Sequence, residues 1–509
     1  MTSNTNKECY TVEYDGVYAY IRDPSTEIEE ELKNSLKYTD KNIEHANRRN
    51  PKYKRDPQVY LYSKKNQRFL TGLYPRVKEI LEDEEITILT SSLIQKEVSI
   101  DKKDLNNFQP FEGYYLWDHQ KEAIEKILSS KRGIVQMPTG SGKTVVIATV
   151  CSMFPSANII ITSPDVSIMK NNAKTIERVV GEKVGQVGGG KKDYKRITSC
   201  TLDTLMSDLK KDSNFLKDTE VFFADECQSI GDNKRSHTIC KAMPNTVFRI
   251  GVSATALRES GDGLYTEGYL GPIIKETKEE DLQNKGILVK FDYYAIPIAD
   301  NRLIKYSNYK KGRYDTYNGK PDRQEVYREM IVNNKERNNA IIDLIYSYKQ
   351  VNYTYGPALI LAESIEHSEY IYSELSNFLC PEVELELVKG SATKKKREDV
   401  INRLSDKTLR VAVSTRVFNV GVDFPPVGFL IIASGGNATS RLVQQLGRVI
   451  RVAEGKSKAI VVDFKDAERY YLNRNYYNRT KALRDRYPST SISIANADYI
   501  KHRIFLSKI

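Results

Sequence analysis

A glycine-rich segment, residues 137–144, lies between two apolar stretches of the chain and reads Met-Pro-Thr-Gly-Ser-Gly-Lys-Thr. The residues before it, 134–136, have the short apolar character of a buried strand, and those after it, 145–148, begin a helical pattern. Glycines allow backbone N–H groups to turn toward a phosphate, and the helix start adds positive potential. The segment therefore predicts an α/β fold with a phosphate-binding loop.

The polar residues of this loop have expected contacts with a nucleoside triphosphate. The Lys143 ammonium is expected to neutralise the β- and γ-phosphates, and the Thr144 hydroxyl to bind Mg²⁺. Met137 stands where the strict motif has its first glycine, so the pattern departs from the consensus at one position. The residues predicted to hold the nucleotide are Thr139, Gly140, Ser141, Gly142, Lys143 and Thr144.

Two consecutive carboxylates follow another apolar strand pattern. Residues 221–224 are Val-Phe-Phe-Ala, and Asp225 and Glu226 come directly after them. A buried parallel strand places such residues at the carboxyl edge of its sheet, where ligands bind in open α/β folds. We expect Asp225 to hold Mg²⁺ and Glu226 to accept a proton from the attacking water. Upstream, the Gln120 amide has the donor and the acceptor needed to read an adenine base.

Changes in pattern along the chain predict its domains. Residues 111–285 and 286–465 each alternate short apolar runs with helical patterns, which predicts two α/β lobes in series. Residues 1–110 carry aromatic and β-branched runs and one short amphipathic helix pattern, as expected of a small α+β accessory domain that could bind DNA. Residues 466–509 read as a basic, tyrosine-rich extension.

Composition limits the classes of partner. Lys and Arg number 78 against 67 Asp and Glu, a formal net charge of +11, which favours an anionic partner such as a nucleic acid. No apolar stretch is long enough to span a bilayer and the N-terminus has no apolar secretory signal, so a soluble protein without membrane contact is expected. The six scattered cysteines fit the reducing cytoplasm (the host cytoplasm for a phage protein) and predict no zinc site.

Five motifs, taken in order, resemble those of the superfamily 2 helicases. The sequence around Ser253, with Gly271 and Pro272 after it, is similar to the branch that holds the XPB-like helicases and the UvsW-like phage recombination and branch-migration helicases. The resemblance covers about residues 111–465. The matching segments are 139–144, 225–228, 253–255, 415–423 and 444–451, which resemble motifs I, II, III, V and VI.

This resemblance implies two tandem RecA-like lobes that use ATP and Mg²⁺. It assigns Arg448 and Arg451, at i and i+3 on one helix, to the γ-phosphate as arginine fingers, and Gln444 to the attacking water. Gly421 and Asp423 of motif V are assigned to the same nucleotide pocket.

Motif III of the family implies a coupling role between nucleotide and nucleic acid. Ser253 and Thr255 are expected to provide it by hydrogen bonding to Asp225. The sequence departs from the family at Gln228, where histidine is commoner, and at Ala256, where proline is expected. Neither departure removes a catalytic group.

Nucleic acid is expected to be held by hydroxyls and backbone amides that contact phosphates without reading sequence. Basic segments at 48–55 and 394–397 are further candidates for phosphate contact. In the tail, residues 469–486 and Tyr487 interleave tyrosines with Arg and Lys, a pattern that favours stacking on single strands. The candidates by family position are Ser163, Pro164, Thr201, Lys389, Gly390 and Thr415.

The leading hypothesis from the sequence is an ATP-driven DNA helicase that unwinds or branch-migrates forks, D-loops or four-way junctions in replication, recombination or repair. DNA is its expected partner, with recombination or replication proteins as further partners of a monomeric motor. The alternatives are the motor subunit of a restriction system, an RNA or RNA–DNA helicase, and a nucleic-acid clamp with an inactive ATPase. The clamp is disfavoured because Lys143, Asp225, Glu226 and Arg451 are all present.

Overall fold

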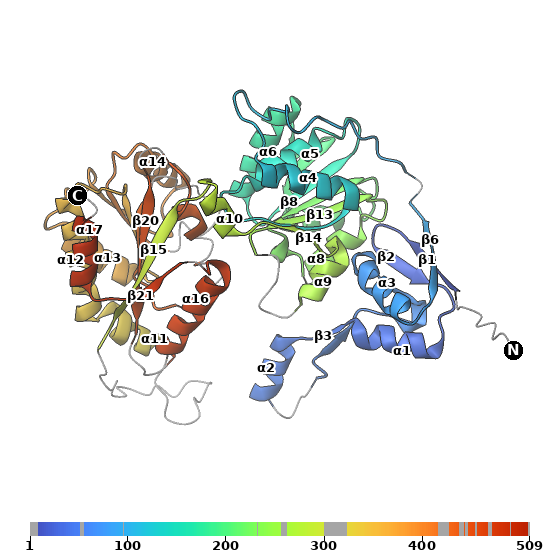
Figure 1. Cartoon of the computed structure of the whole chain (residues 1–509), viewed down its shortest axis with the longest axis horizontal. Helices are drawn as coiled ribbons and strands as arrows, with labels where there is room; N and C mark the ends of the chain where they lie inside the picture. The colour runs from blue at the N-terminus through green and yellow to red at the C-terminus, as the bar shows by residue number, and fades with distance from the viewer. Residues whose placement is uncertain are drawn as a thin grey trace. The chain divides into compact units, whose positions relative to one another are not determined.

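The computed structural model describes two compact units, Met1–Thr277 and Lys278–Ile509 (Figure 1). The division falls eight residues before the boundary expected between the lobes at 285/286; the predicted domain limits themselves stay predictions. The described residues are 9–50, 55–94, 96–231, 233–255, 262–299, 323–415, 427–436, 442, 446–453, 456–466, 471–488 and 490–506.

The first unit begins with a small α+β domain. Its described strands form a mixed sheet in the order β5-β2-β1-β6, and β3 pairs with β4 beside it. The Ser25 side chain caps α1 and Pro75 lies in the first turn of α3, so local sequence sets both helix starts. The elements are β1 (Cys9–Tyr14), β2 (Tyr18–Ile21), α1 (Thr26–Ser35), β3 (Lys37–Thr39), α2 (Lys41–Arg49), β4 (Gln58–Tyr60), η1 (Lys64–Asn66), β5 (Arg68–Leu70), η2 (Thr71–Leu73), α3 (Tyr74–Asp83) and β6 (Thr87–Ser92).

The rest of the first unit is a three-layer α/β lobe. Its strands lie in the order β10-β9-β11-β8-β12-β13-β7-β14, and every described pairing is parallel except that of β10 with β9. The elements are α4 (Asp118–Ser130), β7 (Arg132–Gln136), α5 (Lys143–Cys151), β8 (Ile159–Ser163), α6 (Val166–Val180), β9 (Gly185–Gly188), β10 (Lys191–Asp193), β11 (Ile197–Thr201), α7 (Leu202–Leu209), β12 (Val221–Asp225), η3 (Cys227–Ser229), α8 (Lys234–Lys241), β13 (Phe248–Ser253), α9 (Gly263–Leu270) and β14 (Ile273–Glu276).

Alternate residues of the central strands face opposite sides of this sheet. In β12, Val221 and Phe223 join one hydrophobic cluster, whereas Phe222 and Ala224 join the other. Because helices cover both faces, the strand is apolar at every position until it reaches its carboxyl end. Asp225, the last residue of β12, is the first charged side chain on it.

The small domain packs closely against the lobe. The Gly16 N–H donates to the Pro244 carbonyl at 2.7 Å, and Arg132 donates to the Gly16 carbonyl at 2.8 Å. At Gly72, a Cβ atom would come within 2.1 Å of the Glu267 carbonyl oxygen, so only glycine allows this approach. The larger of the two hydrophobic clusters in this unit includes residues of both the small domain and the lobe.

The second unit is also a three-layer α/β lobe. Its described strands are all parallel, in the order β17-β18-β16-β19-β20-β15-β21, and a hydrophobic cluster fills each side of the sheet. The elements are α10 (Glu279–Asn284), β15 (Lys290–Pro297), α11 (Arg323–Tyr327), η4 (Arg328–Val332), α12 (Lys335–Gln350), β16 (Ala358–Leu361), α13 (Ile365–Leu375), β17 (Leu385–Val388), α14 (Lys394–Ser405), β18 (Val411–Ser414), β19 (Phe429–Ile432), β20 (Lys458–Lys465), α16 (Leu472–Arg486), β21 (Ile492–Ile494) and α17 (Ala497–Leu506).

The C-terminal segment is part of this second lobe. Strand β21 pairs with β15, and Ile500 of α17 is buried in the core. Tyr476 and Tyr487, 3% and 2% exposed, pack in the other cluster. The expectation that these two tyrosines stack on bases is therefore wrong, because their rings have no accessible face; Tyr477, 50% exposed, does have one.

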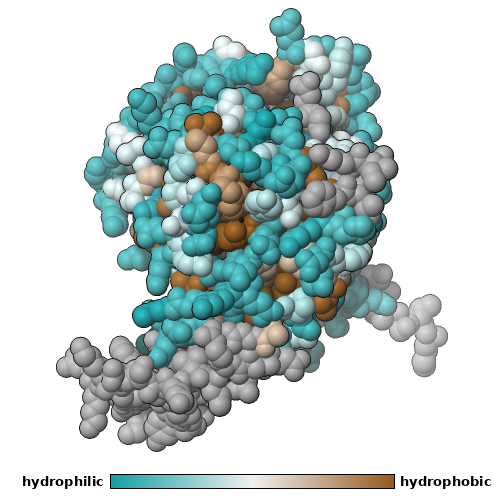
Figure 2. Space-filling model, turned by 90° about the vertical axis from the view of Figure 1, so that its left-hand side faces the viewer, coloured by the Kyte–Doolittle hydropathy of each residue, from teal (hydrophilic) through white to brown (hydrophobic). Residues whose placement is uncertain are grey.

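The described surface is largely polar. Figure 2 shows one end of the molecule, where hydrophilic residues cover most of the face and hydrophobic residues occur in small separate patches. Among the helices that the structure describes, none has both the length and the hydrophobicity to cross a membrane.

Candidate functional site

Three neighbouring strands bring the first three motifs together at one edge of the first lobe's sheet. Strands β12, β13 and β7 are adjacent and parallel, with Asp225 opposite Val252 and Ser253 opposite Gln136 in the ladder. The phosphate-binding loop leaves β7 at this edge, and the carboxylates leave β12 there. This confirms the expected strand, loop and helix context of the loop.

The loop 137–142 is tightly folded on its own carbonyl groups. Gly140 and Gly142 have positive φ angles of 87° and 83°, which glycine adopts without strain. The Ser141 hydroxyl donates to the Pro138 carbonyl at 2.7 Å, and the Lys143 ammonium donates to the carbonyls of Pro138 and Met137 at 3.3 and 3.4 Å. The lysine thus lies at the N-terminus of α5, inside the turn expected to surround the phosphates.

Gln120 supports this loop from behind. Its amide N–H groups donate to the Ser141 carbonyl and the Tyr114 hydroxyl, each at 3.0 Å, and its oxygen accepts from the Trp117 N–H at 3.0 Å. The residue is fully buried, and a Cβ on Gly142 would lie 2.2 Å from its nitrogen. The contact with adenine expected from the sequence stays a prediction; the structure adds a second role, holding the loop in place.

His119 makes a matching contact that sequence reasoning missed. Its Nε2 atom lies 3.0 Å from the Ser141 carbonyl oxygen, a distance at which it donates. The ring also packs beside Trp117, with centroids 5.6 Å apart. The side chains of His119 and Gln120 both donate to the Ser141 carbonyl, so the start of α4 holds the middle of the loop 137–142.

Asn172 joins the two halves of the site. This α6 residue is 1% exposed; its amide donates to Asp225 Oδ2 at 2.8 Å and to the Ser163 hydroxyl at 3.1 Å. Its oxygen accepts from the Thr144 hydroxyl at 3.2 Å. The residues expected to hold Mg²⁺, Thr144 and Asp225, therefore both bond to one amide. Sequence reasoning missed Asn172 because nothing in its own helix pattern distinguishes it from a core-facing residue.

The environment of Asp225 disfavours its charge. Burial, and secondly the charge of Glu226, raise the pKa of Asp225 to about 6, against the opposing effects of the Asn172 hydrogen bond and the Lys143 charge. The protein thus keeps a carboxylate in a poorly solvated place, where a cation would stabilise the ionised form.

Glu226 is held in an unusual backbone conformation. Its φ of 55° lies in the left-handed region, which costs a non-glycine residue about 1–2 kcal/mol. This turn directs its carboxylate toward Gln228, whose amide donates to Glu226 Oε2 at 2.7 Å. The other end of the Gln228 amide accepts from the Ser253 hydroxyl at 2.5 Å.

Motif III therefore contacts motif II through Gln228. The expectation that the Ser253 side chain bonds directly to Asp225 is wrong, because its hydroxyl donates to the Gln228 amide oxygen. Thr255 donates its N–H to the Ser253 oxygen at 2.9 Å. Gln228, which replaces the commoner histidine, is long enough to bond both Glu226 and Ser253. The sequence contained a signal for this contact, because it departs from the family at this position.

Thr144 and Asp225 present a hydroxyl and a carboxylate oxygen, the hard ligands that Mg²⁺ prefers. Within the described ranges, no group of three or more His, Cys, Asp or Glu residues is arranged to bind a metal by itself. Such a sparse protein ligand set fits a Mg²⁺ ion that is bound together with a phosphate.

The nucleic-acid candidates of the first lobe lie side by side. Ser163 and Thr201 end the adjacent strands β8 and β11 and are partners in the ladder. Both are buried, and their hydroxyls bond to Asn172 and Thr204 respectively, whereas Pro164 is exposed. Ser163 and Thr201, which the resemblance assigns to nucleic acid, thus lie at the same edge of the sheet. Their contact with nucleic acid stays a prediction.

The candidates of the second lobe form a similar pair of strand ends. Lys389 and Gly390 follow β17, Thr415 follows β18, and the Thr415 N–H donates to the Val388 carbonyl at 3.1 Å. Gly390 is exposed with open space around it, Lys389 pairs with Glu369, and Thr415 is 6% exposed.

Motifs V and VI are only partly described. Gln444, Gly421 and Asp423 lie outside the described residues, so their predicted roles stay predictions.

Arg448 and Arg451 are partly buried, and the Val289 N–H donates to the Ile450 carbonyl between them at 2.7 Å. The buried Lys456 ammonium donates to the carbonyls of Arg451, at 3.1 Å, and Val449. Burial, with the nearby Arg451 charge, lowers the pKa of Lys456 to about 7.

Comparison with known proteins matches one family model in each lobe. Residues 114–258 match the family described as the res subunit of type III restriction enzymes, and residues 336–453 match the helicase conserved C-terminal domain. In both lobes the chain is similar to the superfamily 2 helicases. It is an ATP-using enzyme whose fold has the expected two parallel-sheet lobes and a small N-terminal α+β region.

Named relatives of the helicase cover most of its length. The DNA 3′-5′ translocase XPB2 of Sulfurisphaera tokodaii is 23% identical over 405 residues, which cover 75% of this chain and 89% of that protein. The ATP-dependent DNA helicase uvsW of Enterobacteria phage T4 is 21% identical and covers 69% of this chain and 68% of that protein. The solved structure of S. cerevisiae Dbp5 bound to RNA and ADP BeF3 matches with a TM-score of 0.54 at 14% identity, covering 78% of this chain and 94% of that chain, which shows a shared fold.

Proposed function

We propose that the helicase is an ATP-driven motor that translocates on duplex DNA and unwinds or branch-migrates forks, D-loops or four-way junctions. The names of two relatives, a DNA translocase and a DNA helicase, support DNA as the substrate. The formal net charge of +11 supports the same class of partner.

The bonded chain from Thr144 through Asn172 to Asp225 is the observation that carries this proposal. It brings the predicted Mg²⁺ ligands of two sequence-distant motifs to the mouth of the phosphate-binding loop. When bound, Mg²⁺ neutralises charge on the β- and γ-phosphates. Lys143 binds those phosphates, and Glu226, held by Gln228, accepts the proton of the attacking water.

Phosphate contacts supply the grip on DNA. The paired ends of β8 and β11 in the first lobe and of β17 and β18 in the second are the proposed contact edges. Helix α2 adds a third surface: none of its described side chains is fully buried, and the basic segment 48–55 begins in its last turn. Contacts of these kinds are independent of base sequence, as a translocating motor requires.

ATP turnover with and without nucleic acid tests the proposal. We expect DNA to stimulate hydrolysis, and the stimulation to decrease steeply with salt because counterions compete with the phosphate contacts. Lys143→Ala is expected to abolish turnover. Equal turnover with and without DNA or RNA would contradict the motor function.

A strand-displacement panel then identifies the substrate. Fork, four-way junction, D-loop, RNA duplex and RNA–DNA hybrid are compared at equal concentration, with Lys143→Ala as the inactive control. We expect the branched DNA substrates to be processed fastest. Preference for the RNA duplex would replace the DNA proposal with an RNA helicase.

A restriction motor is the second candidate, favoured by the description of the family that matches residues 114–258. A motor subunit of that kind depends on a nuclease centre with clustered acidic metal ligands, and the described residues contain no such cluster. Incubation with supercoiled plasmid, ATP and Mg²⁺ decides between them, because only a restriction motor with its nuclease linearises the plasmid.

We further propose that the helicase acts as a monomer in the cytoplasm, together with recombination or replication proteins. The scattered cysteines support a reducing compartment, since the six thiols include none paired in a disulfide among the described residues. Gel filtration with light scattering tests the monomeric state.

A further inference from the structure

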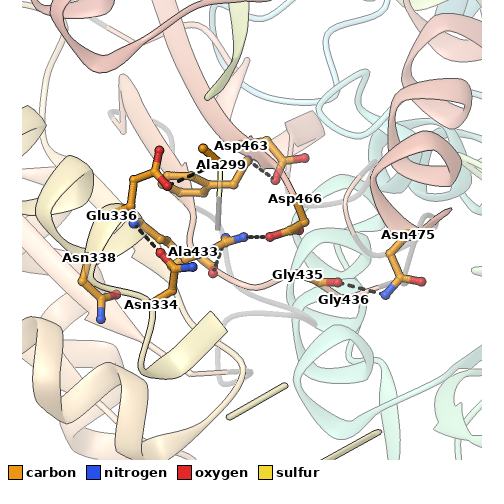
Figure 3. Close-up of polar contacts among 12 residues, drawn as sticks. Ala299, Asn334, Glu336, Asn338, Ala433, Gly435, Gly436, Asp463, Asp466 and Asn475 are labelled. Carbon is orange, nitrogen blue, oxygen red and sulfur yellow. Dashed lines mark hydrogen bonds and ion pairs between the residues drawn. The ribbon is translucent and has the colours of Figure 1, made fainter. Parts of the chain in front are cut away.

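The segment 433–436 directly follows β19, precedes motif VI in the sequence, and is held by its backbone carbonyl groups. The Ala433 carbonyl accepts from Arg337 at 3.1 Å. The Gly435 carbonyl accepts from Asn475 at 2.9 Å, and the Gly436 carbonyl accepts from Arg479 at 2.7 Å. Three of four consecutive residues thus accept hydrogen bonds from side chains far away in the sequence, as Figure 3 shows around Ala433, Gly435 and Asn475.

The two arginines are themselves fixed by buried carboxylates from the end of β20. Arg479 contacts both oxygens of Asp463, at 2.9 and 3.0 Å, and Arg337 pairs with Asp466. The Tyr293 hydroxyl donates to Asp463 at 2.5 Å. Both arginines and both aspartates are between 0% and 3% exposed, so the charges have protein partners in place of water.

Stability alone does not account for such a cluster. Desolvating two arginines and two aspartates costs several kcal/mol per ion, and well-packed apolar side chains often stabilise a protein as much or more. What apolar side chains cannot do is donate to the carbonyls of residues 433–436. The cluster therefore fixes the conformation of this connection, which charge-assisted hydrogen bonds do with greater directionality than packing.

Helix α16 and motif VI also share a hydrophobic cluster. Leu446, Val449 and Ile450, which flank Arg448 and Arg451, are buried in one hydrophobic cluster with Tyr476 and Leu483 of α16. Arg479 lies between those two α16 residues in sequence, with its guanidinium directed to Gly436. Helix α16 therefore contacts the segment 433–436 and shares one hydrophobic cluster with the apolar residues of motif VI.

We propose that Arg479 and Asn475 of α16, with Arg337 of α12, are positioning residues that set motif VI for ATP hydrolysis. This inference rests on the proposed ATPase function and on the role that the resemblance assigns to Arg451. Helix α16, which by sequence belongs to a basic tail, acts through the segment 433–436 on the rate of hydrolysis. Helix α16 thus acts on hydrolysis through other residues and does not contact the nucleotide itself.

Two substitutions of different severity test the proposal. Asn475→Leu keeps the branching and the number of heavy atoms of the side chain and removes the donor to Gly435. Arg479→Lys keeps a positive charge beside Asp463 but cannot bond that carboxylate at both oxygens and Gly436 as well. Asp485→Asn, an exposed change on the same helix, is the matched control. We expect kcat for DNA-stimulated hydrolysis to fall about tenfold or more in both variants, with the Kd for Mg²⁺–ATP close to that of the control.

A double-mutant comparison separates positioning from a general structural effect. If Asn475 acts through motif VI, Asn475→Leu lowers single-turnover hydrolysis in the wild-type background but has no further effect in an Arg451→Ala background. Multiplied losses in the double variant would overturn the proposal, as would a parallel loss of ATP affinity and Tm. Full activity of Asn475→Leu and Arg479→Lys would overturn it too, while leaving the proposed function intact. A wild-type chain without ATPase activity would overturn the proposed function itself.

Discussion

The side-chain amide of Gln228 donates to the Glu226 carboxylate at 2.7 Å and accepts from the Ser253 hydroxyl at 2.5 Å. One glutamine thus bridges the predicted general base and the motif that the family uses for coupling. Because Glu226 has a strained backbone, a side chain that holds its carboxylate in one direction has a direct effect on where the attacking water is bound.

Replacement of Gln228 by glutamate tests this bridge. Gln228→Glu keeps the size of the side chain but puts an oxygen where the amide donor was, so two carboxylates face each other. We expect kcat for ATP hydrolysis to fall about tenfold or more, with little change in the Kd for nucleotide. Gln228→His, which restores the commoner family residue and a donor, is expected to retain most activity. Unchanged turnover in Gln228→Glu would mean that Glu226 is positioned by other contacts.

Asn172 is expected to be needed for Mg²⁺ affinity. Asn172→Leu removes the amide that bonds Thr144, Ser163 and Asp225, and it leaves buried polar atoms unpaired at a cost of about 1–3 kcal/mol. The Mg²⁺ concentration for half-maximal ATPase should therefore rise, as measured by titration at saturating ATP. Asn171→Leu, one position earlier and exposed, is the matched control and should behave as wild type.

The ionisation of Asp225 should make stability depend on pH. Burial is the main cause that raises its pKa to about 6 in the folded protein. Protonation of Asp225 therefore stabilises the folded state fully below about pH 4, and this contribution to the free energy of unfolding is lost as the pH rises through 6. Asp225→Asn removes this buried charge. The variant should unfold at a higher Tm than wild type at pH 7.5, and the difference should disappear near pH 4.

The direction of this effect follows from the direction of the pKa shift. The gain in stability of Asp225→Asn over wild type should increase as the pH rises from 4 to 8. Thermal melts of both proteins without Mg²⁺, at intervals between pH 4 and 8, measure it. A difference in Tm that is constant over this range would show that Asp225 titrates normally.

The close approach at Gly72 should control the attachment of the small N-terminal domain. A Cβ there would lie 2.1 Å from the Glu267 carbonyl oxygen and 2.6 Å from that of Gly268, and backbone cannot yield to it. Gly72→Val is therefore expected to detach the domain from α9 and weaken the neighbouring ion pair between Arg76 and Glu267. Gly390→Ala, at an exposed glycine of the second unit with open space around it, is the control for a glycine lost elsewhere in the chain.

Limited proteolysis measures this detachment. Cleavage between residues 93 and 117 should accelerate in Gly72→Val and release a fragment of the size of the small domain, while Gly390→Ala keeps the wild-type pattern. If the domain stays protected in Gly72→Val, the interface does not depend on contact at this glycine.

The sequence predicted the residues whose chemistry requires a fixed type and spacing. Lys143 and Thr144 were recognisable because a phosphate-binding loop needs glycines before a lysine at a helix start. Asp225 and Glu226 were recognisable because charged residues directly after an apolar strand lie at the carboxyl edge of the sheet, where ligands bind. The tail was the main error: the tyrosines at 476 and 487 alternate with basic residues along the chain, but the helical turn of α16 directs them into the core.

Sequence by itself determined that this chain has two α/β lobes, a glycine-rich loop at a helix start and a pair of carboxylates at a strand end, because each of these depends on residues adjacent in the chain. Tertiary structure alone decided that Asn172 joins Thr144 to Asp225, that Gln228 stands between Glu226 and Ser253, and that α16 holds the segment before motif VI. These contacts join strands and helices that are adjacent only after folding. Burial then gives them their effect, since away from water each polar group must find its partner within the protein.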